Sequence, residues 1–324
     1  MSEPERSEAS DVSVAQRARG SKPSGGARPR IRPWMILLAP AALLILLFYL
    51  VPAVVNLVLA FSDMDYTFDF RFVGGESLVR PLEDPMFGRV LRNTAVYVVT
   101  TLTLMNVGVG VLLAVLTTEI PDRVGGAFRM LWLLPRATPS VVYVLMWFFL
   151  LDPTDYGLVN KVAGALGGEN YDLLSQRPWL VVVLLNGCVG ASMGMVIFTA
   201  AIKSIPPQLM MAARVDGASA WQRIRHVTLP SIAWPIMFVT TYQTLSLLTS
   251  YEYILLATDG GPFYQTEVLP LYIFHNAIND FEFGYGAALS IGLMAIGTVL
   301  ALVYWRVFRF GGRGAAAQRI EVES

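Results

Sequence analysis

The chain has 324 residues, of which 55% are hydrophobic and 15% are charged, and Lys+Arg and Asp+Glu balance at 24 each. A soluble domain carries about 25% charged residues, so this composition excludes an ordinary soluble enzyme. The single cysteine, Cys188, excludes an intrachain disulfide.

The low share of charged residues reflects long apolar runs in the sequence. A helix needs about 20 apolar residues to cross a bilayer, and about six runs reach that length. Helices satisfy their backbone hydrogen bonds within the segment, so the sequence predicts an all-α polytopic membrane protein. The predicted spans are residues 35–61, 93–118, 128–151, 179–203, 229–257 and 285–308.

Basic residues are distributed unevenly between the connections of these spans. The loop at 258–284 contains acidic residues and no Lys or Arg, whereas the segment before Trp34 is rich in arginine. By the positive-inside rule, both termini are predicted to be cytoplasmic. The basic residues of that segment are Arg6, Arg17, Arg19, Lys22, Arg28, Arg30 and Arg32.

Three regions follow from composition. Residues 1–33 are rich in Ser, Gly, Pro and Arg, which predicts a disordered cytoplasmic tail. Residues 34–310 hold the six predicted spans and no inserted soluble domain, and residues 311–324 form a cytoplasmic C-terminal tail. Pro135 and Pro139 predict a kink in the third span.

The polar loop at 206–228, between the fourth and fifth spans, is prone to form helix. Pro206 and Pro207 can open a short helix, and Gly217 ends it. Asp216 or Ser219 can cap a second helix. The loop is therefore predicted to be a protruding cytoplasmic helix–turn–helix, and composition leaves open the alternative that it folds back on its own bundle.

One pattern in this loop is specific. Ala212, Ala213, Asp216, Gly217 and Ala218 are followed at fixed spacing by Leu229 and Pro230. This pattern resembles the signature of the inner-membrane permeases of binding-protein-dependent ABC importers. In that family the loop is the coupling helix that docks on the ATPase subunit.

One position departs from the family pattern. Met211 stands where the family has a glutamate that pairs with a basic residue of the ATPase. Apolar packing of Met211, or polar contacts of Arg214, Asp216 and Arg223, would have to replace that ion pair.

A second pattern narrows the family. Thr258, Gly260, Gly261 and Pro262 resemble the Thr-x-Gly-Gly-Pro external loop of carbohydrate permeases, in particular the first of two paired subunits in maltose- and glycerol-phosphate-type systems. Further segments fit at Phe61–Asp63, Arg92–Thr94 and Tyr156–Asn160, so the resemblance covers about residues 35–310. The large external insertion of the maltose subunit is absent.

The resemblance implies a permease subunit in a prokaryotic inner or plasma membrane that passes an oligosaccharide or polyol. The implied partners are a second homologous permease, two ATPase subunits and an extracytoplasmic sugar-binding protein. ATP and Mg would bind to the ATPases, so no cofactor, metal or catalytic residue is expected in this chain, and no P-loop is present. The basic N-terminal segment fits an orientation signal or contact with anionic lipid better than nucleic-acid binding.

The predicted fifth span contains candidates for the substrate path. Gln243, Ser246 and Ser250 follow i, i+3 and i+4 spacing and should share one helical stripe. Tyr251 and Glu252 follow directly. Asn186, in the fourth span, is a further candidate. Hydrogen bonding between helices is the alternative role for all of these polar side chains.

Two other classes of function are a hydrolase and a secondary transporter. Gly190, Ser192 and Gly194 spell G-x-S-x-G, the nucleophile pattern of hydrolases, but that pattern requires a strand-to-helix turn. The two glycines fit a close-packed helix face better. A secondary transporter often shows an internal repeat and buried ion-coupling charges, and neither is evident in this sequence.

Overall fold

The computed structural model describes residues 33–323, and their side chains from 38 to 307. The predicted tail at 1–33 lies, apart from its last residue, outside the described residues. Every regular element of the described part is a helix, which confirms the all-α class, and a single isolated bridge pairs Ser62 with Phe72. The described residues fall into two units, divided between residues 54 and 55. The first contains α1 (Pro33–Ile45), the π-helical η1 (Leu46–Leu50) and the start of α2 (Val51–Leu59).

Long helices dominate the second unit. One continuous helix consists of α4 (Phe87–Thr100), η2 (Thr101–Val109) and α5 (Gly110–Glu119). It packs against α10 (Pro178–Lys203), and α17 runs over Phe283–Glu323. A large buried cluster joins these helices to residues 247–271. It consists of Tyr97, Val98, Leu102, Val182, Leu247, Leu248, Ile254, Val268 and Leu271.

Small residues allow α10 to approach η2 and α5 closely. A Cβ built on Gly110 would lie 3.3 Å from the Cα of Gly194, and one built on Gly190 would overlap the side chain of Asn106. The prediction that Gly190 and Gly194 form a packing face is therefore confirmed.

Two predicted spans are interrupted. Residues 128–151 belong to α6 (Asp122–Ala137) and α7 (Ser140–Leu151), which meet at an angle of 107°. Thr138 adopts extended backbone, as a residue before proline prefers, so the helix ends where Pro139 begins the turn. The kink predicted from proline is thus a complete break.

The segment 229–257 is interrupted as well. It consists of α13 (Leu229–Ser231), α14 (Ala233–Leu248) and α15 (Glu252–Ala257). Within the described residues four helices have the length and apolar character to cross a membrane, or five if α6 and α7 count as one span. The count of six therefore stays a prediction. The four are Leu38–Leu59, Phe87–Glu119, Pro178–Lys203 and Phe283–Val307.

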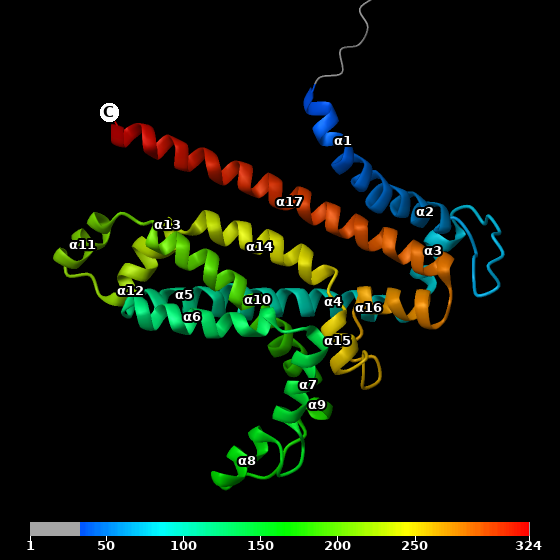
Figure 1. The fold of residues 1–324 in the computed structure, drawn as a ribbon, viewed down its shortest axis with the longest axis horizontal. Coiled ribbons are helices and arrows are strands. Elements are labelled where there is room, and N and C mark those ends of the chain that lie inside the picture. The colour runs from blue at the N-terminus through cyan, green and yellow to red at the C-terminus, as the bar shows by residue number, and fades with distance from the viewer. Residues whose placement is uncertain (1–32, 324) are drawn as a thin grey trace, which may run out of the picture. The chain divides into compact units, whose positions relative to one another are not determined.

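Short helices lie at both ends of the second unit. At one end are α11 (Pro207–Val215), α12 (Ala220–Arg223) and the π-helical η3 (Ile224–Thr228), and α17 finishes on that side (Figure 1). The opposite end holds α3 (Glu76–Glu83), α16 (Leu269–Phe274) and the π-helical η4 (His275–Asn279).

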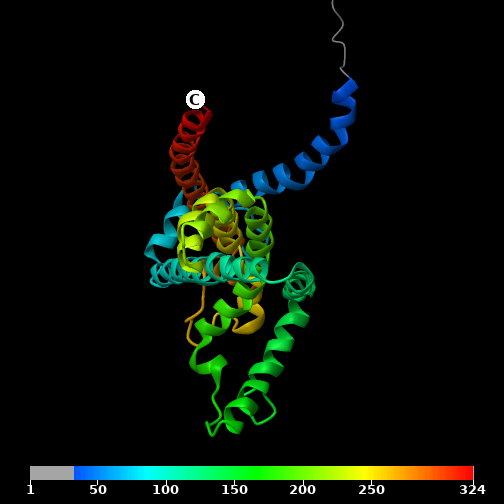
Figure 2. The same cartoon turned by 90° about the vertical axis from the view of Figure 1, so that its left-hand side faces the viewer.

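A separate group of helices leaves the bundle of the second unit. It consists of α7, α8 (Leu158–Ala165) and α9 (Leu173–Gln176), which extend away from the long helices, in green in Figure 2.

Candidate functional site: a coupling loop, a broken-helix junction and an outer loop

The coupling loop is built by local signals. Gly217 has a φ of +75° at the end of α11, and the amide of Ala218 donates to the carbonyl of Ala213 at 2.9 Å. These are the features of a Schellman turn, which favours glycine at this position. Ser219 then caps α12 in a reciprocal pair with Gln222. The predicted helix–turn–helix is confirmed.

The same loop exposes apolar side chains. Met211 is 55%, Val215 87% and Trp221 66% exposed. Exposed apolar residues gathered on one loop mark a surface for a partner. The loop therefore protrudes and does not fold back on the bundle. Val215 and Trp221 were not among the predicted contacts. Large apolar residues in an otherwise polar loop could have indicated them.

The remaining predicted coupling residues have different surroundings. Arg214, Asp216 and Ala212 are exposed, whereas Ala213 and Ala218 are half-buried. Arg223 is half-buried, and its Nη1 donates to the carbonyl of Ala218 at 3.2 Å. Arg223 is thus engaged within the loop itself.

Asn186, Gln243 and Ser250 form hydrogen bonds that join separate segments of the chain. Asn186 Nδ2 donates to the hydroxyl of Tyr97 at 2.6 Å and to Ser250 Oγ at 2.8 Å. Gln243 Nε2 donates to the carbonyl of Gly190 at 2.9 Å, and Gln243 is buried. These contacts match the alternative role considered from the sequence.

Only two of the three residues of the predicted stripe lie on one helix. Gln243 is buried and Ser246 is exposed, while Ser250 lies beyond the end of α14 at Leu248. The regular helical spacing assumed in the sequence ends before Ser250, so its hydroxyl can turn toward Asn186.

The two interrupted spans meet at one point. Ser140 begins α7, Glu252 begins α15, and Ser140 Oγ donates to Glu252 Oε1. Next to this bond the rings of Tyr143 and Tyr253 pack edge to face, 6.0 Å apart. Glu252 is exposed. Ser140 was not predicted, because its partner is 112 positions away in the chain.

Tyr251 completes this side of the junction. Its ring stacks on Phe274 of α16, with centroids 5.3 Å apart. The start of α15 is therefore fixed both to α7 and to the outer helix α16.

The outer loop between α15 and α16 is held from α4. Asn93 Nδ2 donates to the carbonyls of Tyr264, Gln265 and Glu267 at 3.2, 3.1 and 3.0 Å. Thr94 Oγ1 accepts from the amide of Leu269 at 2.8 Å. The Arg92–Thr94 segment that matched the family thus has a structural role in fixing this loop.

The Gly260–Gly261–Pro262 motif lies inside the same loop. Gly260 has a φ of +77°, and a Cβ there would overlap the carboxylate of Glu267. Glycine is required at this position for both reasons. Sequence reasoning recognised the motif but not this close approach.

Glu267 is fully buried and faces a histidine. Its Oε1 lies 2.9 Å from Nδ1 of His275, and Nε2 of His275 lies 3.0 Å from Asp259 Oδ1. Burial raises the pKa of Glu267 above its ordinary value, although the nearby His275 acts in the opposite direction.

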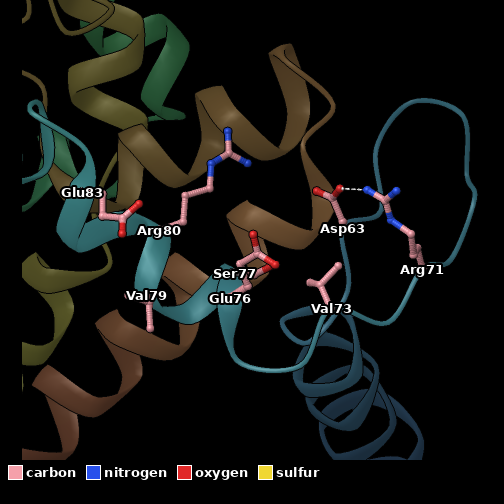
Figure 3. Close-up of a pocket in the computed structure, with 8 residues that line it drawn as sticks. All are labelled: Asp63, Arg71, Val73, Glu76, Ser77, Val79, Arg80 and Glu83. Atoms are coloured by element: carbon pink, nitrogen blue, oxygen red, sulfur yellow. Dashed lines mark hydrogen bonds and ion pairs between the residues drawn. The ribbon is translucent and has the colours of Figure 1, made fainter.

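A polar pocket of about 380 Å³ is formed by α3 and the loop before it (Figure 3). The Asp63–Arg71 ion pair, 2.6 Å long, lies at one end and Glu83 at the other. Arg80 binds Glu282 at 2.8 Å and lies over the ring of Tyr285, so the pocket is tied to α17. The lining residues are Asp63, Arg71, Val73, Glu76, Ser77, Val79, Arg80 and Glu83.

Ser192 does not lie in the surroundings of a hydrolase nucleophile. It is buried in the middle of α10, and its Oγ donates to the carbonyl of Val189 at 2.7 Å. The strand-to-helix turn that the pattern requires is not formed at this position.

The chain is similar to several known proteins along most of its length. It is 28% identical to the sulfoquinovosyl glycerol transport system permease protein SmoG of Agrobacterium fabrum, over 85% of this chain and 90% of that protein. It is 29% identical to the lactose transport system permease protein LacF of Rhizobium radiobacter, over 86% of this chain and 94% of that protein.

The fold is also known from a solved structure. A bacterial ABC transporter that imports the acidic polysaccharide alginate contains a chain with a TM-score of 0.75 and 24% identity, covering 85% of this chain and 95% of that one. Residues 106–309 match the family described as binding-protein-dependent transport system inner membrane component. Since this match covers more than half of the sequence, the chain belongs to that family of ABC transporter membrane subunits.

Proposed function

We propose that this chain is one of two permease subunits in an ABC importer for a sugar, either an oligosaccharide or a polyol. The observation that carries the proposal is the coupling loop, which presents Met211, Val215 and Trp221 uncovered at one end of the second unit. The similar permeases named for lactose and for sulfoquinovosyl glycerol support a carbohydrate substrate. This chain spans at least nine-tenths of both.

The proposed assembly has three kinds of partner. Two ATPase subunits bind ATP and Mg, and one of them receives the coupling loop. A homologous permease forms the other half of the path, and an external binding protein delivers the sugar. This chain itself holds no cofactor and performs no bond-making chemistry. The α11 end faces the cytoplasm together with both termini, in a prokaryotic inner or plasma membrane.

Docking on the ATPase is mainly apolar in this proposal. Met211 replaces the family's glutamate, and Val215 and Trp221 supply additional exposed area beside it. Large aromatic anchors dominate many interfaces. The exposed charges of Arg214 and Asp216 then set the rim of the contact.

The substrate path passes the junction of α7 and α15. Backbone that leaves helical geometry at membrane depth is tolerated where it is buried or lines a water-filled cavity, and interrupted helices form the binding sites of many transporters. Glu252 and Ser140 would offer hydrogen bonds to sugar hydroxyls there, and Ser246 is exposed on α14, the helix before α15. Closure of the ATPases on ATP shifts the bundle between its two access states.

Reconstitution tests this function. The purified complex of both permeases and the ATPases, in liposomes with the binding protein, should accumulate labelled sugar only when ATP is present. Uptake by this chain alone, driven by an ion gradient, would instead establish a secondary transporter. Ligand binding by the purified binding protein would identify the sugar.

A further inference from the structure

Two aromatic residues, Phe263 and Tyr264, lie next to each other in the loop between α15 and α16, and they are called its tip below. Phe263 is 88% and Tyr264 53% exposed. Their φ angles are +51° and +59°, a region that is costly for bulky residues. Backbone of this kind persists only where surrounding contacts enforce it, and it gathers at functional sites.

Strong local contacts enforce this conformation. Asn93 donates to the carbonyl of Tyr264 itself, and the amide of Thr266 donates to the carbonyl of Gly260 at 3.0 Å. The hydroxyls of Thr258 and Thr266 lie 2.8 Å apart at the base of the loop. The backbone that carries the two rings is therefore fixed before any partner arrives, which lowers the entropic cost of binding.

The surroundings of the tip are aqueous. Asp259 lies in the same loop, and its side chain is 69% exposed. A carboxylate exposed to hydrocarbon would be costly, so this loop faces water and not lipid. The tip and the coupling loop lie at opposite ends of the second unit (Figure 1). If the coupling loop meets the ATPase, the tip faces the external compartment.

We propose that Phe263 and Tyr264 form a docking contact for the external binding protein. The proposal rests on the proposed function, because that function supplies a soluble partner on this side. Rigid, exposed aromatic residues are the residue type that most often dominates protein interfaces. The rings would insert into an apolar recess on the rim of the binding protein.

Titration of ATP hydrolysis with the sugar-loaded binding protein tests this contact, using the whole complex in nanodiscs. Phe263→Ala and Tyr264→Ala should each raise the half-saturating concentration of binding protein about tenfold, as expected for a hot-spot residue. Basal hydrolysis and the maximal stimulated rate should not change. Phe70→Ala is the matched control, because Phe70 is 53% exposed on a different outer loop, and it should leave the titration unchanged.

Two further variants test whether the conformation of the loop and direct contact of Phe263 are responsible for binding. Asn93→Leu removes the bond to Tyr264, and it should raise the half-saturating concentration although both rings are present. Phe263→Cys in a Cys188→Ala background, labelled with a benzophenone maleimide, should photo-cross-link to the purified binding protein.

The outcomes separate the two proposals. Suppose that the wild-type complex responds to the binding protein and that Phe263→Ala and Tyr264→Ala respond equally well. This result would overturn the docking contact alone. Cross-linking only to the second permease or to lipid would also overturn it. A wild-type complex that hydrolyses ATP without any response to the binding protein would overturn the proposed function, and the docking contact with it.

Discussion

At the residue scale, single side chains fix the outer loop across long sequence separations. Asn93 reaches carbonyls more than 170 positions away, and Thr94 caps the start of α16. An unsatisfied buried carbonyl costs about 1–3 kcal/mol, and of the three carbonyls within reach of the Asn93 amide the one of Glu267 is buried, so this bond stabilises the loop. Glu267 is the opposite case, because its buried carboxylate has one oxygen without a hydrogen-bond partner.

The raised pKa of Glu267 predicts a pH-dependent stability. The Glu267 carboxyl binds its proton more tightly in the folded chain than in the unfolded chain, where its pKa is close to the ordinary value of 4.5. The stabilisation is fully present below that value and is lost as the pH rises through the folded pKa. The detergent-solubilised chain should therefore melt at a lower temperature as the pH rises across this window. Glu267→Gln keeps the shape without the charge and should flatten the profile, and an equal slope in both proteins would contradict the assignment.

At the element scale, the sequence predicted structure well where the signal was local. Pro206, Gly217 and Ser219 act within a few residues of their own positions, and the predicted helix–turn–helix was correct. Pro139 indicated a kink, but the size of the bend depends on how α7 packs against α15, which local sequence does not record. Hydrogen bonding between helices was considered for Asn186 and Gln243, but their particular partners could not be foreseen, since these lie far away in the chain.

The prediction at the element scale concerns the contact between the coupling loop and the ATPase subunit. Trp221→Ala should weaken association with the ATPase subunit about tenfold or more, because the indole is an exposed aromatic anchor. Trp234→Ala is the matched control, since Trp234 is 69% exposed on α14, outside the loop. Association is measured by titrating the purified ATPase onto the permease pair. Equal loss in both variants would point to general destabilisation instead of a docking role.

At the scale of the whole molecule, the structure connects the coupling loop to the junction of the broken helices. The helix α14 follows the loop directly through η3 and α13, and it ends at the turn before Glu252. On the other side α7 and α15 share a buried cluster that includes Tyr143 and Tyr253. A force on the loop can thus travel along α14 to the start of α15 and move it relative to α7.

This arrangement predicts that the bond between Ser140 and Glu252 must open during transport. Ser140→Cys and Glu252→Cys, combined in a Cys188→Ala background and joined by a short bis-maleimide, should reduce sugar uptake at least tenfold, because the two helices could no longer separate. Binding of the ATPase subunits should be unaffected, since the coupling loop lies at the other end of α14. Each single-cysteine variant treated with the same reagent serves as the control. If the doubly substituted, cross-linked protein transports at the rate of these controls, α7 and α15 move as one rigid body and the path does not open between them.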